Sequence, residues 1–188
     1  GLLRHVYLRR GEVSVEVLLT LVINGDKIPA EKELCEKICG EFPAIVGILI
    51  NENRESTNVI LGEKFITLHG RDYIIDRLAG VELKITAPSF YQVNHGTATL
   101  IYEVARRLAA LEKSDTLLDL YCGTGTITLC LARRAKKAIG VEIIDAAIED
   151  AKKNAERNGI QNAEFFCADA GQTAIKLSQE GTRPDVIV

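Results

Sequence analysis

Thr-Leu-Leu-Asp-Leu-Tyr-Cys-Gly-Thr-Gly-Thr, residues 116–126, is the stretch that decides the fold. Its apolar start predicts a buried strand, which stops at Gly123 and Gly125, and a helical pattern with Ile127 and Leu129 follows. Strand, Gly-x-Gly turn and helix together begin a nucleotide-binding β-α-β unit. Glycine lets the backbone approach a ligand because it has no side chain, and the helix N-terminus adds unpaired N–H groups with a partial positive charge.

Two acidic residues follow at the ends of the next strands. The strand predicted at 138–142 ends in Glu142, about 20 positions after the glycines, where a carboxylate can accept both hydroxyls of a ribose. A third strand at 163–167 is followed by Asp169. Both acids should lie at the same edge of a parallel sheet, which favours a nucleoside ligand over an ordinary strand–turn–helix without one.

The third glycine of the dinucleotide pattern Gly-x-Gly-x-x-Gly is missing, because Thr128 stands there. That glycine allows a helix to pack closely under a pyrophosphate. Its absence, together with Asp119 before the loop, favours S-adenosylmethionine, which has no phosphates, over NAD or FAD.

The composition limits the compartment. The chain has 188 residues, 47% of them hydrophobic, which is enough core for one large or two small domains. The sequence contains no run of 18 or more apolar residues, so no membrane span is predicted, and no signal peptide is visible. The five cysteines are an odd number without a disulfide framework, which predicts a reducing cytoplasm. Cys35 and Cys39 lie four residues apart and cannot close a metal site alone, so we expect packed thiols and no metal.

The overall charge of the chain does not predict a nucleic-acid partner. The net charge is −3, and Lys+Arg against Asp+Glu is 11 to 13 in residues 1–87 and 12 to 13 in residues 88–188. An RNA-binding protein usually shows a basic footprint, so such a surface would be local or belong to other parts of a longer protein. The chain begins with glycine, has no methionine and ends on an apolar strand, and we expect it to be an excised piece.

The first half predicts a small α+β domain over residues 1–87. Strands are expected at 2–9 and 13–23 around a hairpin turn, then at 44–50, 59–61, 65–68, 73–75 and 81–85. One helix should run from Pro29 to about Glu41, with Leu34, Ile38 and Phe42 on one face.

The second domain is expected over residues 88–188, beginning at Pro88. A helical stripe at 100–111 precedes the first strand, and strands at 138–142, 163–167 and 185–188 alternate with helices at 124–134, 145–158 and 171–179. This order predicts an α/β fold with a doubly wound parallel sheet. Right-handed crossovers place all strand C-termini at one edge, where ligands bind. The exposed last strand invites pairing with a second copy.

Four segments together resemble one enzyme family: Ser-Phe-Tyr-Gln-Val-Asn at 89–94, Leu-Asp-Leu-Tyr-Cys-Gly-Thr-Gly-Thr at 118–126, Gly-Val-Glu at 140–142 and Asn-Ala-Glu-Arg-Asn-Gly at 154–159. The sequence resembles the RNA uracil-C5 methyltransferases, and among them it is most similar to the bacterial 23S ribosomal RNA enzymes. Leu-Arg-His-Val at 3–6 and Gly-Arg-Asp-Tyr-Ile at 70–74 resemble the family's central domain. The resemblance implies a truncated Rossmann-like class I S-adenosylmethionine methyltransferase domain after a small α+β domain.

The resemblance also implies a reaction on RNA. A cysteine thiolate adds to C6 of uracil, C5 then takes a methyl group from the sulfonium of S-adenosylmethionine, and a base removes the C5 proton before the thiolate leaves. The target base must leave its stack to be reached.

The chain departs from this family where catalysis is concerned. The family's Asp-Pro-Pro-Arg motif, its nucleophilic cysteine and its base are expected beyond Val188, so no catalytic residue is assigned here and the chain by itself is expected to be inactive. The RNA-binding barrel domain and the iron–sulfur cysteines of some members are also absent from the sequence. Cys122 is nearest to the cofactor, and we interpret it as a small residue tolerated in a tight loop.

The resemblance implies seven cofactor-binding residues: Gln92, Tyr121, Gly123, Gly125, Thr126, Glu142 and Asp169. Glu142 would accept the ribose hydroxyls, and Asp169 would accept from the adenine amino group. Tyr121 would pack beside the cofactor, and Gln92 would lie at the cofactor and target-base site. Asp119 is expected to brace the loop, and His95 to be peripheral.

Two other functions stay open. The chain could belong to a class I methyltransferase that acts on an amine or a protein, which the sequence after residue 188 would reveal. It could also be a non-catalytic module that binds RNA or a partner; loss of cofactor binding in Glu142→Ala with unchanged RNA binding would argue against that.

Overall fold

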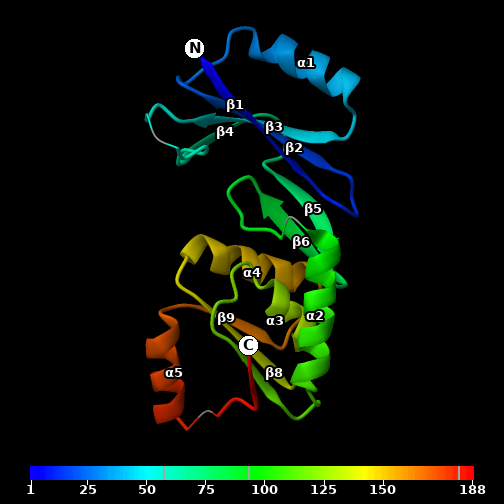
Figure 1. Cartoon of the computed structure of the whole chain (residues 1–188), viewed down its shortest axis with the longest axis vertical. Coiled ribbons are helices and arrows are strands. Elements are labelled where there is room, and N and C mark those ends of the chain that lie inside the picture. Colours follow the sequence, from blue (N-terminus) through cyan, green and yellow to red (C-terminus); the bar gives the residue numbers. More distant parts are fainter. Residues whose placement is uncertain (57, 93, 182) are drawn as a thin grey trace. The chain divides into compact units, whose positions relative to one another are not determined.

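The computed structural model of the chain describes residues 1–56, 58–92, 94–181 and 183–188 (Figure 1). The chain forms two compact units. The first unit consists of Gly1–Asp76 with Ile85–Pro88, and the second consists of Arg77–Lys84 with Ser89–Val188. The division runs through a hairpin, and the tip of this hairpin, residues 77–84, belongs to the second unit. The sequence predicted the whole hairpin in the first domain, before residue 88.

The first unit is a four-stranded sheet with one covering helix. Its strands stand in the order β1-β2-β3-β4, with β2 and β3 parallel and the outer pairs antiparallel. The parallel pair exists because a helix, α1, connects β2 to β3 and lies along one face of the sheet (Figure 1). Leu21, Ile23, Ile48 and Ile50 form the core beneath α1 together with Cys35 of that helix. The elements are β1 (Leu3–Arg10), β2 (Val17–Ile23), α1 (Glu31–Glu41), β3 (Ile45–Glu52) and β4 (Lys64–Gly70).

The second predicted strand begins later than expected, at Val17 rather than at residue 13. The side chain of Asp76, 1% exposed, accepts hydrogen bonds from three successive backbone N–H groups of this segment. Its Oδ2 atom is 2.9 Å from the N atom of Glu12, and its Oδ1 atom is 2.9 Å from that of Val13 and 3.1 Å from that of Ser14. Because these donors bind a carboxylate, they are not used in a strand ladder.

The strand predicted at 59–61 is wrong. The amide of Asn53 donates to the carbonyl oxygens of Val59 at 2.8 Å and Ile60 at 3.0 Å, so a side chain takes the acceptors that a neighbouring strand would need. The expected place of Phe42 is also wrong, because it is the C-cap of α1 and is 53% exposed. Cys35 takes the buried position instead.

Strands β5 (Tyr73–Leu78) and β6 (Val81–Thr86) form a separate two-stranded sheet. Ala79 and Gly80 connect them with φ values of 48° and 81°. Two consecutive residues of positive φ make the tight turn whose twist matches that of a hairpin.

The second unit contains the doubly wound sheet, and this prediction is confirmed. Four parallel strands stand in the order β10-β7-β8-β9. The chain moves outward from β7 to β9 and then returns to place β10 on the other side of β7. The order therefore reverses at β7, where ligands bind in folds of this class. The elements are α2 (His95–Ala109), β7 (Thr116–Asp119), α3 (Thr126–Ala132), β8 (Lys137–Glu142), α4 (Asp145–Arg157), β9 (Ala163–Cys167), α5 (Ala170–Gln179) and β10 (Val186–Ile187).

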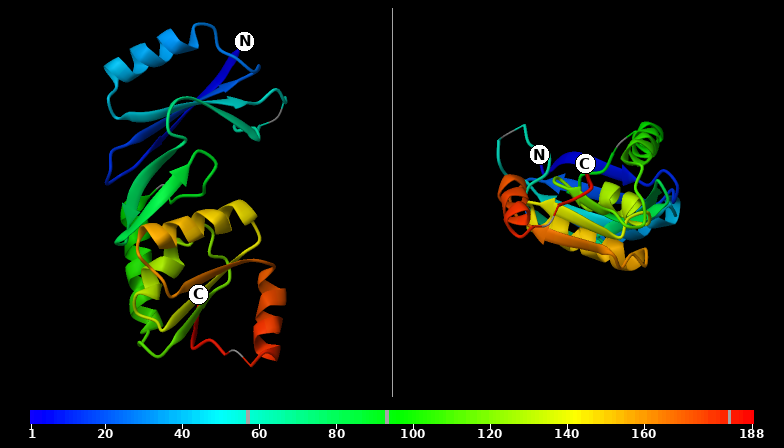
Figure 2. Two further views of the ribbon diagram at one scale, coloured as in Figure 1. Left: turned by 180° about the vertical axis from the view of Figure 1, so that it is seen from behind. Right: turned by 90° about the horizontal axis from the view of Figure 1, so that it is seen from below.

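The helices of this unit cover both faces of the sheet (Figure 2). Leu118, Ile139 and Val141 form a cluster with Leu177 of α5 on one face. On the other face α3 and α4 pack against β7, β8 and β9. The strands β7 and β8 are buried in nearly continuous runs, which gives both faces a buried layer, as a parallel sheet requires.

Helix α2 keeps its apolar stripe largely exposed. Leu100 and Leu108 are 68% and 77% exposed, and Ile101 and Val104 are also exposed. Ala98 is its buried residue. Among the described residues, none of the helices is long and apolar enough to cross a membrane.

Candidate functional site at the strand ends

The glycine loop after β7 has two glycines with different roles. Both lie in the left-handed region, Gly123 at φ 53° and Gly125 at φ 81°. A Cβ atom on Gly125 would be 3.0 Å from the Cβ atom of Ala151 and from the Phe165 ring, so this glycine is needed for packing. A Cβ atom on Gly123 would meet nothing within 4 Å. Gly123 therefore leaves open space above the backbone, as an approaching ligand requires.

Asp119 braces this loop from below, in agreement with the interpretation from the sequence. It is 3% exposed, its Oδ2 atom accepts from the Thr128 hydroxyl at 2.5 Å, and its Oδ1 atom is 3.4 Å from the N atom of Tyr121. Burial raises the pKa of Asp119; the hydrogen bonds from Thr128 and Tyr121 oppose this shift, and the charge of Glu142 adds to it. Thr128, which stands where the dinucleotide pattern has its third glycine, donates the hydrogen bond that holds Asp119 in place.

Glu142 ends β8 and its carboxylate faces the loop. Its Oε2 atom accepts from the N atom of Gly123 at 3.2 Å, and its Oε1 atom accepts from those of Ile143 at 2.8 Å and Ile144 at 3.1 Å. The structure thus brings together two of the predicted site residues, Glu142 and Gly123. The backbone donors hold the carboxylate at the switch point of the sheet.

Asp169 lies at the end of the neighbouring strand. The ends of β8 and β9 are joined by a hydrogen bond from the N atom of Ala168 to the carbonyl oxygen of Glu142, at 3.0 Å. Asp169 follows as the exposed N-cap of α5, and its Oδ1 atom accepts from the N atom of Gln172 at 2.9 Å. One carboxylate oxygen therefore caps the helix, and no hydrogen bond within the described residues engages the other, which can accept from a ligand's donor.

The remaining predicted residues are placed less tightly. Tyr121 is 81% exposed on the loop, and Thr126 is the first residue of α3, with its hydroxyl 3.5 Å from that of Thr124. Gln92 is exposed, and no hydrogen bond among the described residues connects it to the loop. Val93, in the same segment, lies outside the described residues. His95 begins α2, and its Nε2 atom is 2.8 Å from the carbonyl oxygen of Arg77.

Asn154 is a supporting residue that the sequence reasoning missed. It is fully buried in α4; its Nδ2 atom donates to the carbonyl oxygen of Thr124 in the glycine loop at 3.1 Å, and its Oδ1 atom accepts from the N atom of Lys84 at 2.9 Å. One turn further, Asn158 exchanges two hydrogen bonds with the backbone of Glu82, at 2.7 and 2.9 Å. The two asparagines of the 154–159 segment, four positions apart, were the available signal.

Cys122 is not a candidate nucleophile. Burial raises the pKa of its thiol to about 12, and the charges of Asp119 and Glu142 add to the shift. The thiol stays protonated at neutral pH, whereas a nucleophile needs the thiolate. Within the described parts of the chain, no cluster of three or more His, Cys, Asp or Glu residues could hold a metal ion.

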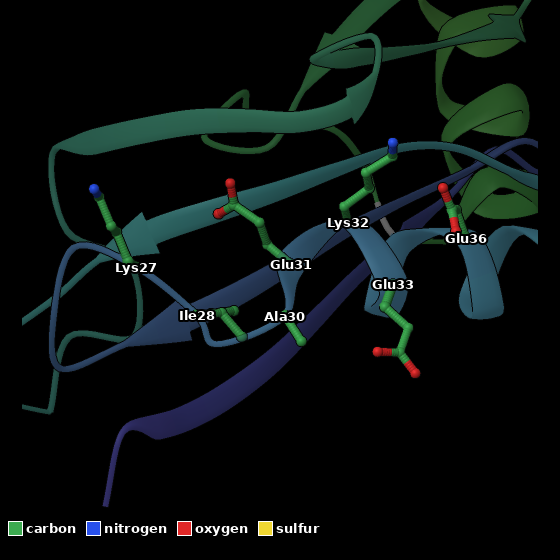
Figure 3. Close-up of a pocket in the computed structure, with 7 residues that line it drawn as sticks. All are labelled: Lys27, Ile28, Ala30, Glu31, Lys32, Glu33 and Glu36. Atoms are coloured by element: carbon green, nitrogen blue, oxygen red, sulfur yellow. The ribbon is translucent and has the colours of Figure 1, made fainter.

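Two hollows lined by described residues lie away from the predicted site. One of about 680 Å³ lies in the first unit at the start of α1 and is lined by Lys27, Ile28, Ala30, Glu31, Lys32, Glu33 and Glu36 (Figure 3). Another, of about 420 Å³, lies between α4 and β9.

Comparison with known proteins agrees with this fold. Residues 111–188 match a family model described as a methyltransferase domain. Proteins of Clostridium acetobutylicum and Streptococcus pyogenes serotype M18, each named as an uncharacterized RNA methyltransferase, are 42% and 43% identical over the whole chain. The chain spans only 41% of the length of these relatives.

Solved structures give the same result. The tRNA (uracil-54, C5)-methyltransferase of Pyrococcus abyssi, in complex with S-adenosyl-L-homocysteine, is 29% identical with a TM-score of 0.72 over 90% of this chain and 40% of that one. A tRNA m1G37 methyltransferase of M. jannaschii, 20% identical with a TM-score of 0.52, shares the fold over 90% of this chain and half of its own. The second unit has the Rossmann-like fold of the class I methyltransferases, and the methyltransferase family model together with the Pyrococcus abyssi structure supports S-adenosylmethionine as its cofactor.

Proposed function

We propose that this chain is the cofactor-binding part of an enzyme that methylates C5 of uracil in RNA, with 23S ribosomal RNA as the substrate that the sequence resemblance favours. The observation that carries the proposal is the Glu142 carboxylate held against Gly123 at the switch point of the sheet. Relatives named RNA methyltransferases match the whole chain, and a tRNA uracil-C5 methyltransferase matches most of it, which supports both the substrate class and the target atom.

The cofactor roles follow from the donor and acceptor inventory of the site. Glu142 would exchange its backbone donors for the ribose hydroxyls, and the free oxygen of Asp169 would accept from the adenine amino group. Gly123 would let the backbone approach, with Gly125 and Thr126 shaping the turn. Tyr121 and Gln92 would contact the cofactor from the exposed side. When bound, S-adenosylmethionine supplies an electrophilic methyl group.

None of the five cysteines is proposed as the nucleophile. Burial raises the pKa values of the Cys122 and Cys130 thiols to about 12. Cys35, a buried residue of α1, also has its thiol pKa raised, chiefly by burial. All five are free thiols, which supports a cytoplasmic location. We propose the domain boundary near residue 88, with the hairpin tip of residues 77–84 serving the methyltransferase domain.

Calorimetric titration with S-adenosylhomocysteine tests the cofactor site. We expect the chain to bind it and Glu142→Ala to bind at least 10-fold more weakly, because hydrogen bonds to a charged group contribute about 1.5–3 kcal/mol. Glu149→Ala, on the exposed side of α4, removes a carboxylate outside the site and should bind normally. Equal affinity of the two variants, or no binding by the unaltered chain, would refute the site.

Release of tritium from RNA that carries uridine labelled at C5 tests the catalytic assignment. We expect none from this chain with S-adenosylmethionine, because none of its five cysteines matches the position of the family's nucleophile, which adds to C6. Methyl transfer to uridine-containing RNA by this chain would overturn that assignment. In a relative that spans the full length, methylation at an atom other than C5 would refute the proposed specificity.

A further inference from the structure

A cluster of cations lies at the opposite edge of the parallel sheet, where the strands begin. We call it the strand-start surface, and it consists of Arg107, Lys113, Arg133, Arg134 and Lys136, all exposed. They come from the end of α2, the turn before β7 and the turn between α3 and β8. The stretch Arg-Arg-Ala-Lys-Lys at 133–137 has four cations in five residues and no acid. Such clustering is typical of nucleic-acid contacts.

The backbone beneath this surface is held in place. The N atom of Lys136 donates to the carbonyl oxygen of Asp115 at 2.8 Å, which ties the two turns together. Asn162 donates from its amide to the carbonyl oxygens of Ala132 at 2.7 Å and Ala135 at 3.0 Å. The backbone that carries the cations is therefore a fixed scaffold, so RNA binding does not need to order these turns.

Most of the nearby acids are already engaged. Glu103 accepts hydrogen bonds from Arg106, and its pKa is lowered first by these bonds and then by the charges of Arg106, Arg134 and Arg107. Glu164 pairs with Lys137 at 2.9 Å, and Asp185 accepts from the N atom of Thr116 at 2.8 Å.

Two further acids lie on the turn before β7, and the cations themselves are unpaired. Asp115 accepts from the N atom of Glu112 at 2.8 Å, and the Glu112 side chain is not paired in the described part of the chain. None of the five cations forms an ion pair among the described residues; Lys113 donates to the carbonyl oxygen of Arg133 at 2.6 Å, which does not neutralise it.

We propose that the strand-start surface binds RNA phosphates and anchors a part of the substrate distant from the methylated base. This inference rests on the proposed function for the choice of RNA as the partner. The surface reconciles a net charge of −3 with an RNA substrate, because the positive charge is local.

The geometry sets the size of the RNA. The six residues of β8 separate the two edges of the sheet by roughly 20 Å at about 3.3 Å per residue. An RNA held at both edges must pass around the unit, so the substrate is a folded or long RNA rather than a few nucleotides. Phosphate contacts of this kind position the RNA without reading its sequence.

The salt dependence of RNA binding tests the proposal. A fluorescein-labelled, uridine-containing RNA hairpin is titrated with the chain at increasing KCl, and affinity is read from fluorescence anisotropy. In the triple variant Arg133→Gln, Arg134→Gln, Lys136→Gln we expect the slope of log affinity against log salt to become shallower by about 2 to 3, since each lost phosphate contact removes about 0.7–0.9. With a hairpin of shuffled sequence, the triple variant should show the same decrease in slope.

A matched variant separates this surface from net charge. Lys152→Gln, Lys153→Gln, Lys176→Gln removes three exposed cations from α4 and α5 and reaches the same net charge. Its slope should stay within experimental error of the unaltered chain. Equal slopes for the two triple variants, or no RNA binding by the unaltered chain, would overturn the proposal.

Two controls keep the result interpretable. Affinity for S-adenosylhomocysteine should be unchanged in the first triple variant, which shows that it is folded. If that variant does not fold, the double variant Arg107→Gln, Lys113→Gln gives the same test with an expected change of about 1 to 2. The slope does not depend on which atom is methylated, so failure of the uracil-C5 assignment would leave this result intact.

Discussion

Asp119 is a buried carboxylate whose folded-state pKa lies above the ordinary aspartate value, chiefly because of burial. A raised pKa means that the folded protein binds this proton more tightly than the unfolded chain does. The contribution to stability is then present at low pH and is lost as the pH rises through the folded-state value. Keeping Asp119 ionised in the folded protein therefore lowers the free energy of unfolding, and its hydrogen bonds from Thr128 and Tyr121 offset part of this loss.

Replacing Asp119 by Asn removes this titration. We expect the free energy of unfolding of the wild type, measured relative to Asp119→Asn, to fall as pH rises from about 4 to about 7, the range above the usual aspartate pKa. Urea denaturation of both proteins across that range gives the difference directly. A difference that stays constant with pH would contradict the assignment of a raised pKa.

The cysteines should differ in reactivity by their surroundings. In the folded chain we expect iodoacetamide to modify exposed Cys167 first and to leave Cys122 and Cys130 unmodified over the same time, because their pKa of about 12 leaves almost no thiolate. Peptide mass spectrometry of the alkylated protein measures this order. In urea the difference should vanish; alkylation of folded Cys122 at the rate of Cys167 would show that its thiol is activated.

At the scale of elements, the two glycines of the loop have different roles: Gly125 is needed for packing, and Gly123 leaves room for a ligand. We expect Gly125→Ala to lower the free energy of unfolding by about 2–4 kcal/mol, from the left-handed backbone and the contact with Ala151 and Phe165. Gly123→Ala should cost only the backbone term, about 1–2 kcal/mol, but weaken S-adenosylhomocysteine binding by filling open space.

Urea denaturation and calorimetry on the same two variants measure both effects. The two variants serve as controls for each other, because each adds one methyl group at a residue of positive φ and the two residues are two positions apart. Equal losses of stability, or unchanged cofactor affinity in Gly123→Ala, would contradict the division of roles.

At the scale of the whole molecule, the hairpin tip belongs with the second unit. Asn154 and Asn158 bind the backbone of Lys84 and Glu82, and Leu78, Val81 and Leu83 are 1% exposed. We expect a chain of residues 77–188 to be more stable than one of residues 89–188 by at least about 3 kcal/mol, since three hydrogen bonds at about 1 kcal/mol each are lost along with apolar burial. Thermal unfolding followed by circular dichroism compares the two, and equal midpoints would show that the tip contributes nothing.

Local signals predicted the second unit well. Gly123, Gly125 and the strand–helix alternation after them are short-range patterns, and a parallel sheet converts them into topology with little freedom because crossovers are right-handed. The same reasoning placed Glu142 and Asp169 at one edge. It failed where side chains compete for backbone groups, as Asp76 does at residues 12–14 and Asn53 at residues 59–60.

The sequence by itself determined the fold class of this protein, the glycine loop and the place of Glu142 at the end of β8. Each of these depends on residues that are close together in the chain. Only the tertiary structure decided that Asn154 supports the loop, that Thr128 holds Asp119 and that the hairpin tip joins the second unit. These contacts join residues 9 to 76 positions apart. No periodicity encodes such pairs, since they form only when packing brings a buried polar group to the one partner within reach.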